Sequence, residues 1–110
     1  MSAARTPLRW LSFTLSDGDD GVSTLDAEAS SRDPEAVAGM RAEAERVIAW
    51  ARQRFAASEG AVEDGADWDH HLHQGVEAGG WQVLALTFSA SARFVSAFER
   101  AFGLDGAQDD

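Results

Sequence analysis

The chain has no cysteine, lysine, asparagine or tyrosine, and the first two of these absences remove whole classes of chemistry. Without cysteine there is no thiol nucleophile, thiolate metal ligand or redox centre. Without lysine there is no Schiff base and no phosphate-loop lysine. All nine basic residues are arginine, a bias that indicates a GC-rich bacterial genome. Because a chain without cysteine has no disulfide bonds, we expect a cytoplasmic protein.

Long hydrophobic runs and positive charge are also scarce. No segment approaches the roughly 20 apolar residues of a membrane helix, and residues 1–7 lack the apolar run of a secretory signal. The chain carries 9 basic and 19 acidic residues, a formal charge of -10. Binding to nucleic acid or anionic lipid rests mainly on basic side chains, so we expect neither as a partner. A basic protein would be attracted instead.

The size of the chain predicts one domain. With 110 residues, of which 45% are hydrophobic, it can bury roughly two-thirds of the surface that its unfolded form exposes. We expect a single α+β domain over residues 1–104. Residues 105–110, which end in two aspartates, should form a flexible acidic tail.

Two stretches near the N-terminus alternate apolar and polar residues with the period of a β-strand. They cover residues 8–16 and 22–30, and a turn-forming stretch separates them. We therefore expect an antiparallel hairpin. The side chains expected on its core face are Leu11, Phe13, Leu15, Leu25, Ala27 and Ala29.

Two helices are predicted from their capping residues. The first should begin at Asp33-Pro34-Glu35, which combines a capping aspartate, a proline in the first turn and an early acidic residue. It should extend to about residue 57. The second should be capped by Ser91 and ended by Gly103. The first helix has an apolar stripe formed by Val37, Met40, Ala44, Val47, Ile48, Ala51 and Phe55.

A second hairpin is expected between the helices, with strands at residues 68–77 and 81–89. The length of its loop at Ala78-Gly79-Gly80 decides which residues share a face. A two-residue loop would separate Trp68 and Leu72 from the apolar side of the next strand, whereas a three-residue loop with a glycine bulge would place them beside it. We therefore expect the three-residue loop and a shared core face formed by Trp68, His70, Leu72, Leu84, Leu86 and Phe88.

The element order predicts a ββαββα fold: a four-stranded, mainly antiparallel sheet with both helices packed on one face. The other face would then be open, unless a loop or the N-terminal segment covers it. Two tryptophans and two valines would make it more apolar than a solvated sheet face requires. The residues that we expect on this interaction face are Trp10, Ser12, Thr14, Val22, Trp81, Val83 and Ala85.

This face and the negative charge together favour a protein-interaction module, such as a regulator, an adaptor or an immunity-type inhibitor. Its partner would be a basic protein or a second copy of the chain. The sequence contains no nucleophile elbow, phosphate-cradling loop or dinucleotide fingerprint. Enzymatic activity is therefore the less favoured interpretation.

The alternative function is a small metal-dependent or ligand-binding enzyme, and it rests on a cluster of histidines in the first strand of the second hairpin. On a strand, Asp69, His71 and His73 would project from one face about 7 Å apart. Imidazole and carboxylate groups bind zinc or manganese, and an open coordination position would allow catalysis. The sequence places no fourth ligand. The competing interpretation is that these residues are polar side chains on a solvated sheet.

Overall fold

The computed structural model describes residues 8–18 and 21–104. The expected acidic tail at residues 105–110 lies outside this range. The elements in chain order are β1 (Thr14–Asp17), β2 (Ser23–Ser31), α1 (Pro34–Arg54), the 3-10 turn η1 (Val62–Asp64), β3 (Trp68–Glu77), the turn η2 (Ala78–Gly80), β4 (Trp81–Ala90) and α2 (Ala92–Phe102).

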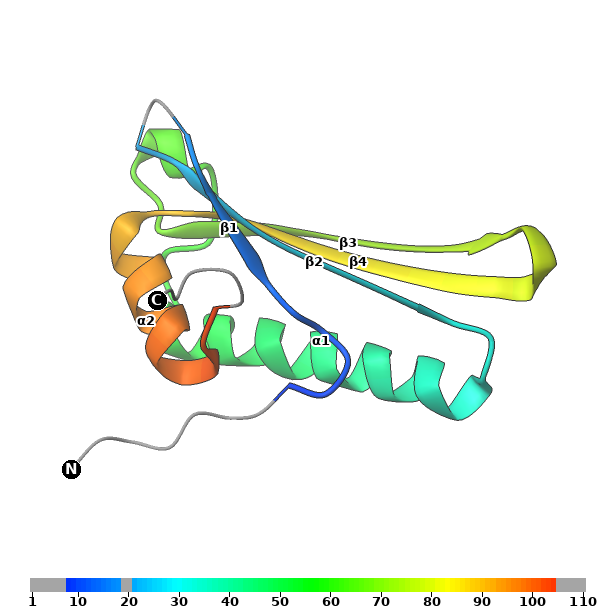
Figure 1. The fold of residues 1–110 in the computed structure, drawn as a ribbon. Helices are drawn as coiled ribbons and strands as arrows, with labels where there is room; N and C mark the ends of the chain where they lie inside the picture. Colours follow the sequence, from blue (N-terminus) through cyan, green and yellow to red (C-terminus); the bar gives the residue numbers. More distant parts are fainter. Residues whose placement is uncertain (1–7, 19–20, 105–110) are drawn as a thin grey trace.

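The four strands form one antiparallel sheet in the order β1-β2-β4-β3. Both helices lie on the same side of this sheet (Figure 1). The predicted α+β class, the ββαββα order and the two-layer arrangement are therefore confirmed. Neither helix in the described part of the chain is long and apolar enough to cross a membrane.

The helix starts follow the predicted capping residues. The Asp33 carboxylate accepts a hydrogen bond of 3.3 Å from the Glu35 amide, and the Ser91 hydroxyl accepts one of 3.2 Å from the Phe94 amide. Helix α1 ends at Arg54, three residues before the predicted end. It stops there because the chain turns back to the sheet, where Glu59 forms a parallel bridge with Trp68 at the start of β3.

The second hairpin has the predicted three-residue loop. Glu77 pairs with Trp81, and the loop glycines Gly79 and Gly80 between them take φ values of 84° and 81°, which favour glycine. This register places the following residues of β3 and β4 on the side that faces the helices: Trp68, His70, Leu72, Leu84, Leu86 and Phe88.

The core is most aromatic where α2 meets the sheet. Phe94 and Phe98 of α2 are buried, and the Phe94 ring stacks on Trp68 with centroids 5.8 Å apart. The Trp68 indole donates a hydrogen bond to the Phe55 carbonyl. Trp50 lies at the edge of this cluster, 5.6 Å from the Phe94 ring. The aromatic residues therefore hold α1, α2 and the sheet together at one end of the molecule.

The N-terminal strand is much shorter than predicted. Residues 8–16 were expected to be extended, but β1 covers only Thr14–Asp17. Leu11 and Phe13 are buried as predicted. The backbone amides of Arg9, Trp10 and Leu11 donate to the carboxylate of Glu43 on α1, over 2.6 to 2.8 Å. Because these amides bind a helix side chain, this segment lies on α1 instead of extending the sheet.

The position of Trp10 also differs from the prediction. Its indole lies against Gly39 of α1, so closely that a Cβ atom added at Gly39 would lie 2.5 Å from the indole nitrogen. Trp10 is therefore part of the helix layer and not of the open sheet face. The absence of a side chain at Gly39 makes room for it.

Candidate functional site

The open face of the sheet is centred on β4. Because side chains alternate along a strand and Leu84, Leu86 and Phe88 are buried under the helices, Trp81, Val83 and Ala85 point to the opposite side. Trp81 is 43% exposed, which makes it one of two large apolar side chains that stand out from the described surface. The guanidinium group of Arg32 lies 5.6 Å from the centre of its ring.

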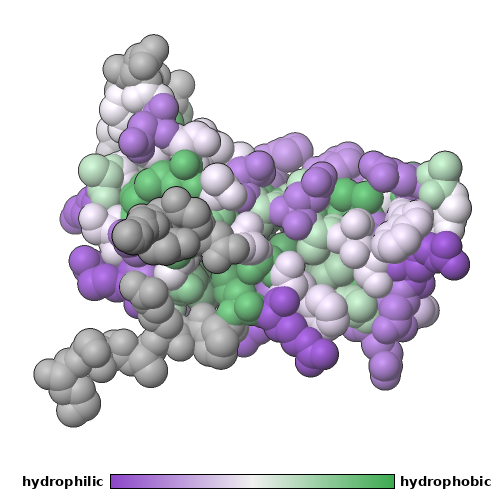
Figure 2. Space-filling view, in the orientation of Figure 1, coloured by the Kyte–Doolittle hydropathy of each residue, from purple (hydrophilic) through white to green (hydrophobic). Residues whose placement is uncertain are grey.

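Polar residues flank this apolar row on both sides. On β2, Glu28 lies opposite Ala85, and Asp26 lies opposite Thr87 and accepts its hydroxyl hydrogen bond over 3.0 Å. On β3, His73 lies opposite Ala85 and Glu77 opposite Trp81. In Figure 2, which views the sheet from its edge, hydrophilic and intermediate residues predominate on the side of the molecule that carries the projecting hairpin. The face thus has an apolar centre and an acidic border.

The predicted interaction face is only partly assembled. Thr14 pairs with Asp26 and belongs to the open side with Trp81, Val83 and Ala85. Ser12 and Val22 lie just outside the strands, before β1 and before β2. With Trp10 on α1, the face keeps one of its two predicted tryptophans.

The predicted metal ligands share the open face, but among the described residues their ligand atoms do not come within 4.8 Å of one another. Asp69, His71 and His73 are exposed and lie opposite Ser89, Thr87 and Ala85 of β4. In residues 8–18 and 21–104, the group whose ligand atoms come within 4.8 Å of one another is instead Glu59, Asp69 and His70. Nδ1 of His70 lies 2.9 Å from a carboxylate oxygen of Glu59.

No regular spacing links Glu59 to the histidines, so sequence reasoning did not find it. Glu59 reaches β3 through the parallel bridge beside Trp68. Its other carboxylate oxygen lies 3.8 Å from Arg52, a cation that opposes metal binding there. Zinc or manganese binding by Asp69, His71 and His73 stays a prediction. A metal titration followed through the imidazole NMR signals tests it, and unmoved signals at stoichiometric metal would reject the site.

A third polar group, around Asp67, joins the start of β3 to the start of α2. Its carboxylate accepts hydrogen bonds of 2.6 Å from Arg93 and 2.8 Å from the Ser91 hydroxyl. These bonds, that from Arg93 first, hold the pKa of Asp67 below its ordinary value of 3.8. Hydrogen bonding to Asp67 in turn raises the pKa of Arg93. Because Asp67 fixes the first turn of α2, we assign it a structural role.

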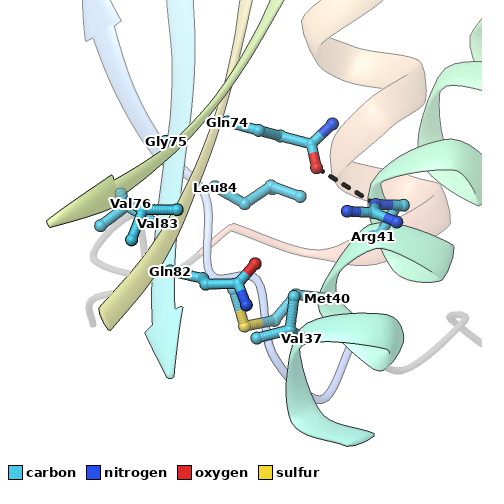
Figure 3. Close-up of a pocket in the computed structure, with 9 residues that line it drawn as sticks. All are labelled: Val37, Met40, Arg41, Gln74, Gly75, Val76, Gln82, Val83 and Leu84. Atoms are coloured by element: carbon cyan, nitrogen blue, oxygen red, sulfur yellow. Dashed lines mark hydrogen bonds between the residues drawn. The ribbon is translucent and has the colours of Figure 1, made fainter. Parts of the chain in front are cut away.

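A hollow of about 160 Å³ lies on the helix side of the sheet, between the start of α1 and the projecting end of the β3–β4 hairpin. In Figure 3, Arg41 of α1 reaches across to Gln74 of β3, and its Nε donates a 3.1 Å hydrogen bond to the amide oxygen. These residues lie far apart in sequence, so no motif indicated the hollow. Its lining is formed by Val37, Met40, Arg41, Gln74, Gly75, Val76, Gln82, Val83 and Leu84.

Comparisons with known proteins add no relative to this description. A scan against protein-family models, a search of curated proteins and a search of solved structures each found no match to the chain.

Proposed function

We propose that this protein is an interaction module that binds a basic protein through the open face of its sheet. The observation that carries the proposal is the apolar row Trp81, Val83 and Ala85 on the side of the sheet opposite α1 and α2. An aromatic residue of this size, partly exposed in an apolar row, is typical of the hot spots of protein interfaces.

The border of the face supports a basic partner. Asp26 and Glu28 lie on one side of the apolar row, and Asp69 and Glu77 lie on the other. Acidic groups around an apolar centre attract a cationic surface and steer its approach. Two copies packed face to face would bring these carboxylates together in a protein whose formal charge is already -10. A second copy is therefore the less favoured occupant.

The surroundings of Trp81 support the same choice. The Arg32 guanidinium stands 5.6 Å from its ring, within the range of a cation–π contact. An arginine of a partner could contact the exposed part of the same ring. The functional class that fits is a regulator, an adaptor or an immunity-type inhibitor, and the lack of cysteine supports a cytoplasmic location.

Site-specific photo-cross-linking in the producing cell tests this proposal. A photoreactive amino acid replaces Val83 on the open face, and a matched control carries it at Ser96, an exposed position of α2. We expect an adduct with one basic protein at position 83 only. The purified pair should dissociate as salt is raised, and Trp81→Arg should abolish binding without unfolding the chain.

Three results would contradict the proposal: equal adducts at both positions, binding that survives Trp81→Arg, or an adduct only with a second copy of this chain. Light scattering on the purified protein at micromolar concentration identifies the last case, because it distinguishes a dimer from a monomer. A dimer dissociated by Trp81→Arg would assign the open face to self-association instead.

A further inference from the structure

The hollow between α1 and the hairpin lies on the opposite side of the sheet from the proposed protein-binding face. It forms because the end of the β3–β4 hairpin projects beyond the start of α1 (Figure 1). Val37 and Met40 of α1 form one wall, and Leu84 of β4 belongs to the wall opposite them. Val76, also part of the lining, is 73% exposed. The interior therefore suits an alkyl chain.

The lining of the hollow includes one cation, Arg41, which has no acidic partner among the described residues. Within the described residues, Arg46, Arg52 and Arg93 each lie within 4 Å of a carboxylate, whereas Arg41 is in no such pair. Arg41 instead donates a hydrogen bond from Nε to the neutral amide of Gln74. That bond orients the guanidinium group and leaves its two terminal nitrogens available to a ligand.

These observations point to a ligand that is apolar at one end and anionic at the other. A planar carboxylate matches the two terminal nitrogens of a guanidinium group. One arginine in a strongly acidic protein is poorly suited to the higher charge of a phosphate group. The volume of about 160 Å³ is smaller than that of pockets for drug-sized ligands, roughly 300 to 1,000 Å³.

We propose that this hollow binds a small aliphatic monocarboxylate of about four to six carbons. Its carboxylate pairs with the terminal nitrogens of Arg41, and the Gln82 side chain, which also lines the hollow, donates from its amide group. The alkyl chain lies against Val37, Met40 and Leu84. Val83, a residue of the proposed protein-binding face, also belongs to the lining of the hollow. The two proposals are therefore told apart by their variants: Arg41→Gln addresses the hollow, and Trp81→Arg addresses the open face.

The test uses the full chain labelled with ¹³C at its methionine methyl groups, titrated with hexanoate. The sequence has only two methionines, Met1 and Met40, so the Met40 signal is assigned by comparison with a Met40→Leu variant. We expect hexanoate to shift the Met40 signal in a saturable manner. We expect 1-hexanol, which has the same chain without the charge, to bind about tenfold more weakly or worse.

Two matched variants test whether the charge of Arg41 itself contributes to hexanoate binding. Arg41→Gln should weaken hexanoate binding about tenfold, while Arg52→Gln, on the same helix but paired with Glu59, should leave it unchanged. Both positions are exposed, and the methionine spectrum itself reports whether each variant is folded. The proposal is overturned if the Met40 signal does not shift, if hexanoate and hexanol bind alike, or if Arg41→Gln and Arg52→Gln bind hexanoate equally.

Discussion

The two ends of the β3–β4 hairpin have opposite environments. At the α2 end, Trp68 and Phe88 are completely buried, and the buried Phe94 of α2 packs against both. At the loop end, Val76 and Trp81 are the two large apolar side chains that stand out from the described surface. The same pair of strands thus supplies both the centre of the core and the most exposed large apolar residues of the described surface.

This difference follows from what each end packs against. Helix α2 brings phenylalanines onto the α2 end, and their interlocking rings fill the space between the layers. The loop end faces the start of α1, where Val37 and Met40 leave a hollow beside Gln74 and Gln82. We infer that the α2 end contributes most to the stability of the fold, whereas the loop end carries residues of both surfaces proposed above for binding.

The largest expected effect is at the α2 end. Phe94→Ala removes a completely buried ring that contacts Trp68, Phe88 and Trp50. It should lower the free energy of unfolding by about 3–5 kcal/mol, because the ring leaves a cavity between rigid neighbours. Denaturant unfolding followed by tryptophan fluorescence measures this. A loss below about 1 kcal/mol would mean that the aromatic cluster does not hold this end together.

A second strong effect is expected at Glu43, which fastens the N-terminal segment to α1. Glu43 is only 3% exposed, and its carboxylate accepts the amide hydrogens of Arg9, Trp10 and Leu11. Glu43→Gln replaces one acceptor oxygen by a donor and removes the charge, so it should cost about 2 kcal/mol.

Hydrogen exchange should then become faster at the amides of residues 9–11. The control is Glu45→Gln, an exposed carboxylate on the same helix, which should change stability by less than about 0.5 kcal/mol. Equal effects of the two substitutions would show that the buried carboxylate is not what holds the segment.

A smaller, pH-dependent effect is expected at Asp67, where β3 joins α2. Hydrogen bonds from Arg93 and Ser91 hold its pKa below 3.8, so its contribution to stability is fully present above the pKa of the unfolded chain. Asp67→Asn should therefore lower the unfolding free energy by about 1 kcal/mol at pH 7. This difference should shrink as the pH falls through the native pKa of Asp67. A difference that stays constant down to pH 2 would contradict this account.

The fold was predictable from the sequence because its determinants are local. Strand alternation, the capping residues Asp33 and Ser91, and the apolar pattern on both sides of the glycine loop each act over a few residues. The register of the β3–β4 hairpin was predictable because the three-residue loop places Trp68 and Leu72 on the core face. The predicted strand over residues 8–16 was wrong for residues 8–13, because the same alternation also fits an irregular segment in which Leu11 and Phe13 are buried.

The sites were less predictable because they join distant segments. Arg41 meets Gln74, and Glu59 meets His70, only after the sheet has paired and α1 has packed. Trp10 alternates with core residues as an open-face residue would, but the space that it occupies is created by Gly39 on another element. The alternation of apolar and polar residues predicts which side of a strand a side chain faces. The contacts of Trp10, Arg41 and Glu59 depend in addition on which other element packs against them.

The smallest expected effect is at the loop end. Val76→Ser shortens an apolar side chain that is 73% exposed, so little buried surface is lost. We expect the free energy of unfolding to change by less than about 0.5 kcal/mol, in contrast to Phe94→Ala. The same denaturant experiment compares the two variants directly. If Val76→Ser costs more than about 1 kcal/mol, the loop end is covered by another part of the chain or by a second copy, and the two ends of the hairpin are not as different as we infer.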